Sequence, residues 1–265
     1  MKTVVCFVNF HCSESINESL ETLPKTMEKI SVFVVDNTSD FSFDKNYGFE
    51  TKVLNPGKNL GYYNGMNHCI SYLGENKIAF DWFLASNPDV IYNDVFFESL
   101  GQLDATEYQK TIIAPSILSG RTGVDLNPQI ANRPSRRKMK FLARVFSSWL
   151  VGNIYISAIH FANKLFKVKN KNYQREESDI YAPHGSLAIF PPSYLQKFGL
   201  KHPCLLFGET IVVAEQAIST GFRVRYLPDL QVIHKEHATT KLVHSKKVMG
   251  YKGEAARLMY SMYWK

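Results

Sequence analysis

The sequence has few cysteines, and they do not form the patterns of a disulfide framework or a zinc site. The four cysteines are scattered over 265 residues without a CxxC pair. We therefore interpret them as reduced thiols of a cytosolic protein. No single stretch combines the length, roughly 18 to 20 residues, with the apolar composition of a membrane span. The first ten residues resemble a buried strand rather than a signal peptide, so we expect no cleaved leader.

Acidic residues are absent from one long segment. Residues 133–175 contain eleven of the 31 Lys and Arg residues and none of the 24 Asp and Glu residues, so the rest of the chain is net acidic although the whole carries +7. Apolar and aromatic side chains, including Trp149 and Phe161, lie within the segment. Basic ends around an apolar middle are typical of a helix on an anionic membrane surface. Packing within the domain and nucleic-acid binding are the alternatives, and no nucleic-acid-binding motif is present.

What the sequence does contain is an alternation of strand and helix patterns. The expected strands are continuous apolar runs near 3–10, 30–35, 52–54, 80–90 and 111–118, and helix patterns separate them near 15–29, 62–73 and 95–103. Such runs indicate an α/β fold with a mostly parallel central sheet flanked by helices. We expect one domain over 1–265, with 133–175 as a basic helical insertion and 241–265 as a C-terminal amphipathic helix.

Polar side chains follow two of the expected strands at the point where each strand ends. Asp36 follows the second strand, and Asp89 lies in Asn87-Pro88-Asp89 after a later one. Ligands of open α/β sheets bind at the carboxyl ends of strands, although an Asp in this position is also a common turn or cap residue. The glycines at 57, 61 and 65 permit close approach to a ligand. Their spacing matches neither GxGxxG nor GxxxxGK[ST], so an ordinary loop is the alternative.

Five motifs follow one another in order: VVDNTSD, NLGYYNGMN, SNPDV, APHGSLAIF and LFGETIVVAEQAISTGFRVRYLPDLQVIH. Together, over residues 1–120 and 180–240, they resemble family 2 glycosyltransferases of the GT-A fold, and most of all the rhamnosyltransferase-like group of bacterial surface-polysaccharide biosynthesis. The resemblance implies metal-assisted, inverting transfer of a sugar, with rhamnose as one candidate, from a nucleotide-diphosphate donor. The acceptor would be a hydroxyl of a lipid-linked or growing bacterial glycan. The enzyme would be cytoplasmic and peripheral on the inner face of the cell membrane.

The resemblance also implies roles for individual residues. Asp89 would hold Mg²⁺ or Mn²⁺ against the diphosphate, and His234 would add a metal ligand. This agrees with the preference of Mg²⁺ for few protein carboxylates beside phosphate and water oxygens. His184 and Gly185 would lie on the acceptor side, although His184 is also compatible with simple packing. The donor site would be lined by Asn9, Asp36, Asn59, Gly61, Asn64, Asn67, Asn87 and Asp89.

The expected catalytic base departs from the family pattern. The family's acidic pair falls at Glu209-Thr210, and the second position, which usually carries the base, is a threonine without useful basicity near pH 7. Glu209 is therefore the candidate base. Glu215 lies 240° further around a helix and is expected to be structural. Use of another carboxylate and weak activity remain alternatives.

Two other classes of protein compete with this interpretation. A nucleotidyltransferase on a similar sheet should carry a Gly-rich loop with Arg or Lys after the first strand, and the segment NFHCSES has neither. A non-catalytic GT-A-like scaffold or binding protein is favoured by Thr210. A zinc site of His234, His237 and His244 would lack cysteine partners at finger spacing. The sugar, the nucleotide, the linkage and the oligomeric state stay open.

Overall fold

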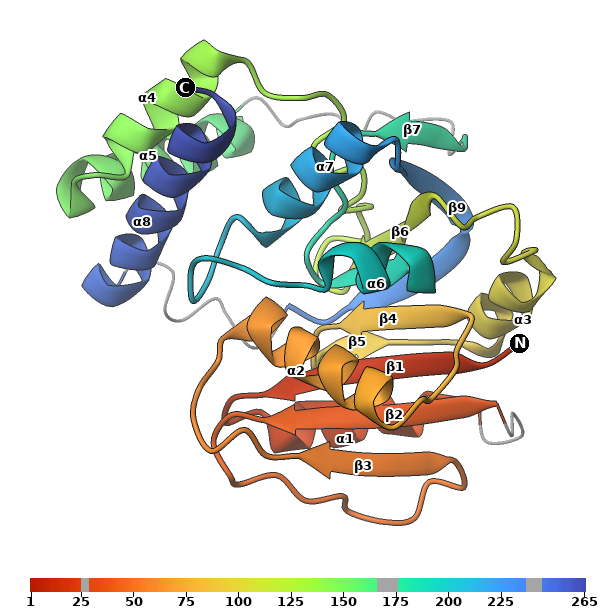
Figure 1. Cartoon of the computed structure of the whole chain (residues 1–265). Coiled ribbons are helices and arrows are strands. Elements are labelled where there is room, and N and C mark those ends of the chain that lie inside the picture. The colour runs from red at the N-terminus through yellow and green to blue at the C-terminus, as the bar shows by residue number, and fades with distance from the viewer. Residues whose placement is uncertain (25–28, 166–175, 237–244) are drawn as a thin grey trace.

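A computed structural model describes residues 1–24, 29–165, 176–236 and 245–265. One sheet of nine strands runs through the molecule, with helices on both of its faces (Figure 1). The strands are β1 (Thr3–Asn9), β2 (Ile30–Asp36), β3 (Glu50–Leu54), β4 (Trp82–Ser86), β5 (Val90–Ile91), β6 (Thr111–Ser119), β7 (Ser178–Ile180), β8 (Leu187–Phe190) and β9 (Arg223–His234). The helices are α1 (Ser13–Glu21), α2 (Tyr62–Glu75), α3 (Asp94–Gln102), α4 (Arg136–Val145), α5 (Trp149–Leu165), α6 (Pro192–Phe198), α7 (Glu209–Thr220) and α8 (Lys246–Tyr263).

The N-terminal half of the sheet is parallel. Its strands lie in the order β3-β2-β1-β4, and every residue of β1 and β2 is buried. The β-branched and aromatic residues of these strands suit a sheet that is covered on both faces. The register pairs Asn9 with Asp36, so the carboxyl ends of β1 and β2 meet at one edge.

The C-terminal half of the sheet mixes strand directions. β8 is antiparallel to both β4 and β6, whereas β6 and β9 run parallel. The short β5 pairs antiparallel with the end of β9, and β7 pairs antiparallel with its beginning. The expected α/β fold with a mostly parallel sheet is therefore confirmed, with antiparallel strands that the alternation of motifs did not indicate.

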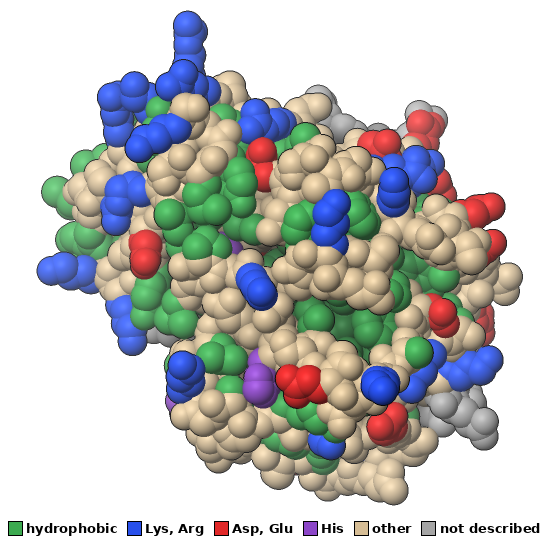
Figure 2. Space-filling model, in the orientation of Figure 1, with side chains coloured by type: hydrophobic (Ala, Val, Ile, Leu, Met, Phe, Trp, Pro, Cys, Tyr) green, Lys and Arg blue, Asp and Glu red, His purple; other side chains and the backbone are tan. Residues whose placement is uncertain are grey.

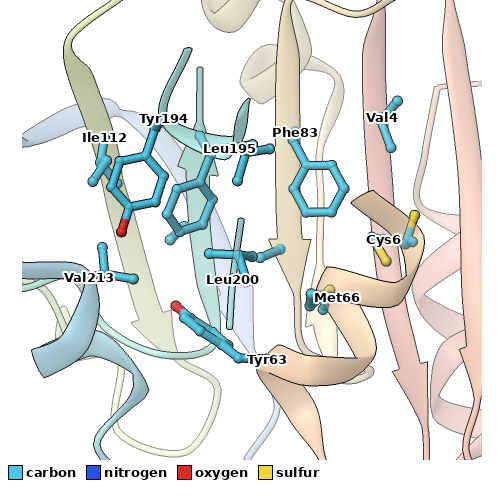
Figure 3. Close-up of a cluster of buried hydrophobic side chains, with 14 of the residues drawn as sticks. Val4, Cys6, Tyr63, Met66, Phe83, Ile112, Tyr194, Leu195, Leu200 and Val213 are labelled. Atoms are coloured by element: carbon cyan, nitrogen blue, oxygen red, sulfur yellow. The ribbon is translucent and has the colours of Figure 1, made fainter. Parts of the chain in front are cut away.

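Two buried clusters occupy the two faces of the sheet. On one face, α2, α6 and α7 pack over the strands, and Tyr63, Met66, Phe83, Tyr194 and Val213 belong to this cluster (Figure 3). On the other face, apolar side chains of α1 and α3 pack against the same strands. Because each central strand contributes side chains to both clusters, the positions at which these strands end are held firmly.

The basic segment and the C-terminal helix form a separate group of helices, α4, α5 and α8 (Figure 1). Serine side chains cap two of them, because the hydroxyls of Ser135 and Ser245 accept the N–H groups of Lys138 and Val248. No single helix in the described residues is long and apolar enough to cross a membrane. By length and composition, α4 and the Trp149–Ile159 part of α5 pass that test as a pair bent by 119°. Positions 166–175 of the insertion, 241–244 of the expected C-terminal helix and 25–28 of the expected first helix lie outside the described residues.

Arg133 joins this group of helices to the sheet domain. Its guanidinium donates two hydrogen bonds to the carboxylate of Glu215 on α7, at 2.7 and 3.0 Å, and a third to the carbonyl of Tyr263 at the end of α8. The Tyr181 hydroxyl donates to the same carboxylate at 2.7 Å, and the Arg133 guanidinium lies over the Trp264 ring. The expected structural role of Glu215 fits these contacts, because its nearly buried charge has three donors.

The Arg133–Glu215 pair should contribute measurably to stability. Replacing Glu215→Gln removes the charge but keeps the shape, and we expect the free energy of unfolding in urea to fall by about 1–3 kcal/mol. Glu177→Gln is the matched control, because Glu177 pairs with Arg225 at the surface, and exposed pairs contribute little. An equal effect of the two substitutions would show that the Arg133–Glu215 pair contributes no more than a surface pair.

Candidate functional site

A polar cluster lies where β1 and β2 end. The Asn9 side chain donates to carboxylate oxygens of Asp36 at 2.9 Å and of Asp40 at 2.6 Å, and it contacts the Thr38 hydroxyl at 3.1 Å. Asp40 also contacts the His11 ring at 2.8 Å. Asn9 and Asp36 were expected in a donor site, and the register of β1 and β2 brings them together. Asp40 and His11 were not expected, although the second Asp of DNTSD was visible in the sequence.

Asp36 is nearly buried yet keeps its charge. Burial alone would raise the pKa of its carboxyl, but hydrogen bonds from the Phe41 N–H, the Asn9 amide and the Thr38 N–H outweigh burial and lower the pKa. A carboxylate held by this many donors is in place before a ligand arrives. It offers acceptor oxygens for the hydroxyls of a sugar or the N–H groups of a base.

The second polar cluster contains Asp89 and His234. The pairing of β5 with β9 sets Val90 beside His234, and the N–H of Lys235 donates to the Asp89 carbonyl at 3.0 Å. This register brings His234 Nε2 to 3.0 Å from Asp89 Oδ1, and both side chains are buried. The two expected metal ligands, 145 positions apart in the chain, are therefore in contact.

His184 extends this cluster. Its ring centre lies 5.9 Å from that of His234, and its ring nitrogen Nδ1 lies 2.8 Å from the Ser186 hydroxyl. The backbone N–H of His184 donates to Asn127 Oδ1 at 2.8 Å. Burial, helped by the neighbouring His234, lowers the pKa of His184 to about 4. The ring is therefore neutral at physiological pH and can accept or donate a hydrogen bond without adding charge. Asn87 joins the same region, because its N–H donates to the Ser186 carbonyl at 2.7 Å.

Cys12 follows β1 and contacts the first of these clusters through Asn9. Its N–H donates to Asn9 Oδ1 at 3.0 Å. Burial raises the pKa of its thiol, and the charges of Asp89, Asp40 and Asp36 raise it further. Because β2, β1 and β4 are adjacent parallel strands, their carboxyl ends, which carry these polar side chains, lie along one edge of the sheet.

The Gly/Asn loop is held by its own side chains. Asn59 Oδ1 accepts the N–H of Gly61 at 2.8 Å, and the amide of Asn37 donates to the Gly61 carbonyl at 3.2 Å. Gly61 has φ +80°, and a Cβ there would lie 2.2 Å from the Leu205 carbonyl oxygen. Only glycine fits this position. A side chain would collide with the Leu205 backbone, and any other residue would also be strained at this positive φ.

Asn64 and Asn67 point to a neighbouring loop. Asn64 exchanges two hydrogen bonds with the backbone of His202, both at 2.9 Å, and Asn67 Oδ1 accepts the N–H of Leu200 at 3.0 Å. These amides attach residues 200–202 to α2. Their contact with a donor stays a prediction, because the bonds that the structure gives them are to protein backbone.

Glu209 begins α7, and two residues with positive φ precede it, of which only the non-glycine Phe207 is strained. Phe207 has φ +70° and Gly208 φ +86°, and Glu209 Oε1 accepts the Phe207 N–H at 2.8 Å. Burial raises the pKa of the Glu209 carboxyl above its ordinary value, although hydrogen bonds from its own N–H and that of Phe207 oppose this. A raised pKa suits a carboxylate that takes up a proton during a reaction. Glu209 lies near the acceptor-side segment, because a Cβ on Gly185 would contact the Thr210 methyl at 3.7 Å.

The Asp89–His234 pair fits a divalent cation. A carboxylate and an imidazole are suitable ligands for Mn²⁺, and the second ring nitrogen of His234 is buried without a hydrogen-bond partner among the described residues. Within the described part of the chain, no group of three or more His, Cys, Asp or Glu side chains gathers as a metal site. The protein would therefore supply two ligands, and phosphate and water oxygens the rest. His237 and His244 lie outside the described residues.

Two surface hollows, each of about 420 Å³, lie away from these residues. One is lined by Lys2, Ile30 and Asp81 at the amino ends of the parallel strands, and the other by Asn93 and Gln231. Neither gathers the polar side chains described above. We assign the site by its convergent polar groups, because those groups, and not the volume of a hollow, supply chemistry.

Comparison with known proteins supports the fold. No family model matches the sequence, and no curated protein does either. The mannosyltransferase PcManGT from Pyrobaculum calidifontis, in complex with GDP-Man and Mn²⁺, is similar with a TM-score of 0.54 and 11% identity over 98% of this chain and 73% of that chain. GalNAc-T7, with UDP, GalNAc and Mn²⁺, is similar with a TM-score of 0.60 and 13% identity over 99% of this chain and 50% of that chain. This chain thus spans half the length of GalNAc-T7, and it has the α/β fold of GT-A glycosyltransferases.

A pair of glycine substitutions tests the close approach at Gly61. Gly57 and Gly61 both have positive φ, but a Cβ on Gly57 would meet nothing within 4 Å. Gly57→Ala should lower the free energy of unfolding by about 1–2 kcal/mol through backbone strain alone. Gly61→Ala should cost clearly more, because its Cβ would also displace Leu205. Urea unfolding of both variants measures the difference, and equal costs would contradict the contact.

Proposed function

We propose that this protein is a glycosyltransferase that moves a sugar from a nucleotide-diphosphate donor to a hydroxyl of a bacterial glycan. The observation that carries the proposal is the contact of Asp89 with His234 at the carboxyl edge of a GT-A sheet. The polar cluster around Asp36 supports it, because it offers fixed acceptors beside that pair. Rhamnose is one candidate sugar.

The donor would lie along the carboxyl edge of the sheet. The nucleoside would contact Asp36 and Asn9, and the diphosphate would lie beside Asp89 and His234. These two residues would hold Mg²⁺ or Mn²⁺, which, when bound, neutralises the charge that grows on the leaving diphosphate. The Mn²⁺ in the complexes of both similar structures agrees with this choice of cofactor.

Glu209 would act as the base. An oxygen of the acceptor hydroxyl attacks the anomeric carbon from the face opposite the diphosphate, and the bond from that carbon to the phosphate oxygen breaks. The bond's electron pair leaves with the nucleoside diphosphate, and the hydroxyl proton passes to the Glu209 carboxylate. Because attack and departure are on opposite faces, the configuration inverts. Burial of Glu209 supports the role by raising its proton affinity.

The acceptor is proposed to be a lipid-linked or growing glycan at the inner face of the bacterial cell membrane, with the protein cytoplasmic and peripheral. The basic, apolar segment 133–175 supports this placement, because its composition suits an anionic surface. We expect no nucleic-acid partner.

A second candidate is a non-catalytic binding protein with the same fold. Thr210 favours it, because this position, which usually carries the base in the family resembled, is not ionisable here. Such a protein would keep the donor contacts of Asp36 and Asp89 without turnover. Binding and transfer must therefore be measured separately.

Nucleotide binding tests the donor site. In a thermal-shift screen of UDP, dTDP, GDP and CMP, we expect one nucleotide to raise the melting temperature, and Mn²⁺ to enlarge the shift. Asp89→Asn should abolish the Mn²⁺-dependent part, because it removes a charged ligand. Asp229→Asn, an exposed change on the same strand as His234, should keep the full shift. If no nucleotide shifts the folded protein with or without Mn²⁺, the donor site is wrong.

Transfer kinetics test the base. Glu209→Gln should lower the rate of transfer by roughly 10²–10⁴-fold while donor affinity stays unchanged. Asp94→Asn, in the first turn of α3, is a matched control and should retain activity. The wild-type rate should rise with pH through a pKa above that of an ordinary Glu, because the base acts when deprotonated, and this limb should vanish in Glu209→Gln. Donor binding without transfer in the wild type would favour the binding protein.

A further inference from the structure

Helix α5 presents an apolar stripe to solvent. Leu150, Ile154 and Phe161 are 59%, 61% and 63% exposed, and the small residues Ser157 and Ala158 between them are exposed as well. At 100° per residue, these positions fall on one side of the helix. Isolated apolar side chains on a surface are ordinary, but a continuous stripe along one helix marks an interaction surface.

Cationic side chains lie beside the stripe on α4. The helix exposes Phe141, and its exposed charged residues are Arg136, Arg137, Lys138, Lys140 and Arg144. No acidic residue occurs on α4 or α5. Figure 2 shows basic and hydrophobic side chains gathered at the upper left, over the region of α4 and α5 in Figure 1.

The two helices are firmly attached to the molecule. α8 packs against both, and its close approach to the end of α4 depends on a glycine, since a Cβ on Gly253 would meet the Phe146 carbonyl oxygen at 2.2 Å. Arg133, just before α4, binds Glu215 on α7. α7 is the helix that begins at Glu209. The surface therefore has a fixed orientation relative to the candidate base.

We propose that α4 and α5 form an anionic-lipid docking surface, with the stripe Leu150-Ile154-Phe161 in the lipid interface and the α4 cations at the level of the headgroups. This deepens the membrane placement proposed above by naming the contacting residues, and it rests on the proposed function only for the identity of the acceptor. An amphipathic arrangement with a cationic border is the form that interfacial helices take.

The charge and apolar character of this surface favour an anionic membrane over a second copy of the chain or a nucleic acid. Two copies of the chain meeting through this face would bring their cations together without opposing carboxylates on α4 or α5, which is unfavourable. An anionic membrane supplies both the negative charge and the apolar phase that the surface lacks. A nucleic acid would pair with the cations but would leave the aliphatic stripe in water.

Trp149 provides a direct measurement. It is 48% exposed at the start of α5, whereas the other two tryptophans, Trp82 and Trp264, are buried. Addition of phosphatidylglycerol–phosphatidylcholine vesicles to the full chain should shift Trp149 emission to the blue, and pure phosphatidylcholine should do so far less. Trp149→Phe should remove the shift but not co-sedimentation. Salt should weaken binding, because the cations contribute through screened charge.

Variants separate the two parts of the surface. The triple change Leu150→Ser, Ile154→Ser, Phe161→Ser should reduce vesicle binding by roughly tenfold or more. Replacing Arg137→Ala and Lys140→Ala should reduce it by about fivefold for each cation. The matched controls are Val95→Ser with Ile218→Ser, which are exposed apolar residues elsewhere, and Lys77→Ala with Lys110→Ala. These controls should bind as wild type does.

Three results would overturn the proposal: equal binding to neutral and anionic vesicles, no emission shift with either, or equal loss in the control variants. A concentration-dependent dimer that the triple variant dissociates would assign the stripe to contacts between copies instead. Circular dichroism and urea unfolding check that each variant is folded. No sugar donor takes part, so failure here leaves the proposed transferase activity untouched, and loss of activity leaves the docking surface untouched.

Discussion

The pairing of β5 with the end of β9 is the constraint on which the site depends. Two residues of β5 suffice to set Val90 opposite His234, and this register places Asp89 next to the imidazole. The backbone bond from Lys235 to Asp89 holds the same register. A carboxylate is thus buried beside a histidine at the edge where the parallel strands end, which is where an α/β sheet binds its ligands.

Around that contact, the loops hold each other in place more than the strands do. Asn64 and Asn67 bind the backbone of residues 200–202, and Gly61 touches Leu205, so the donor-side loop and the segment before Glu209 are one packed unit. The strained Phe207, followed by Gly208 with its positive φ, then directs Glu209 into the start of α7. Strain of this kind persists only where surrounding contacts over-determine the backbone, as they do here. A substitution in the donor-side loop should therefore alter the position of the candidate base Glu209, although the two are far apart in sequence.

The sequence predicted the strands well because their apolar runs are long and are covered on both faces, and it placed Asp36 and Asp89 at strand ends because each lies where such a run turns polar. It did not indicate the antiparallel insertion of β8, because a four-residue strand carries no signal of direction. The contacts of Asn64 with His202 and of Arg133 with Glu215 could not be predicted from the sequence either, because they join residues far apart in the chain. Asp40 was visible beside Asp36, but only the folded loop shows that Asn9 holds both carboxylates.

Helix α7 connects the candidate site with the helices of the proposed docking surface. Its first residue is the half-buried Glu209, whose carboxyl has a raised pKa, and Glu215 lies on another side of the helix, where it pairs with Arg133. One helix thus places one carboxylate for proton transfer and another for attachment of α4. If α4 and α5 lie on a membrane, the rigid link through Arg133 fixes the height and direction of Glu209 above the lipid. An acceptor anchored in the same membrane would then meet the candidate base at a set distance.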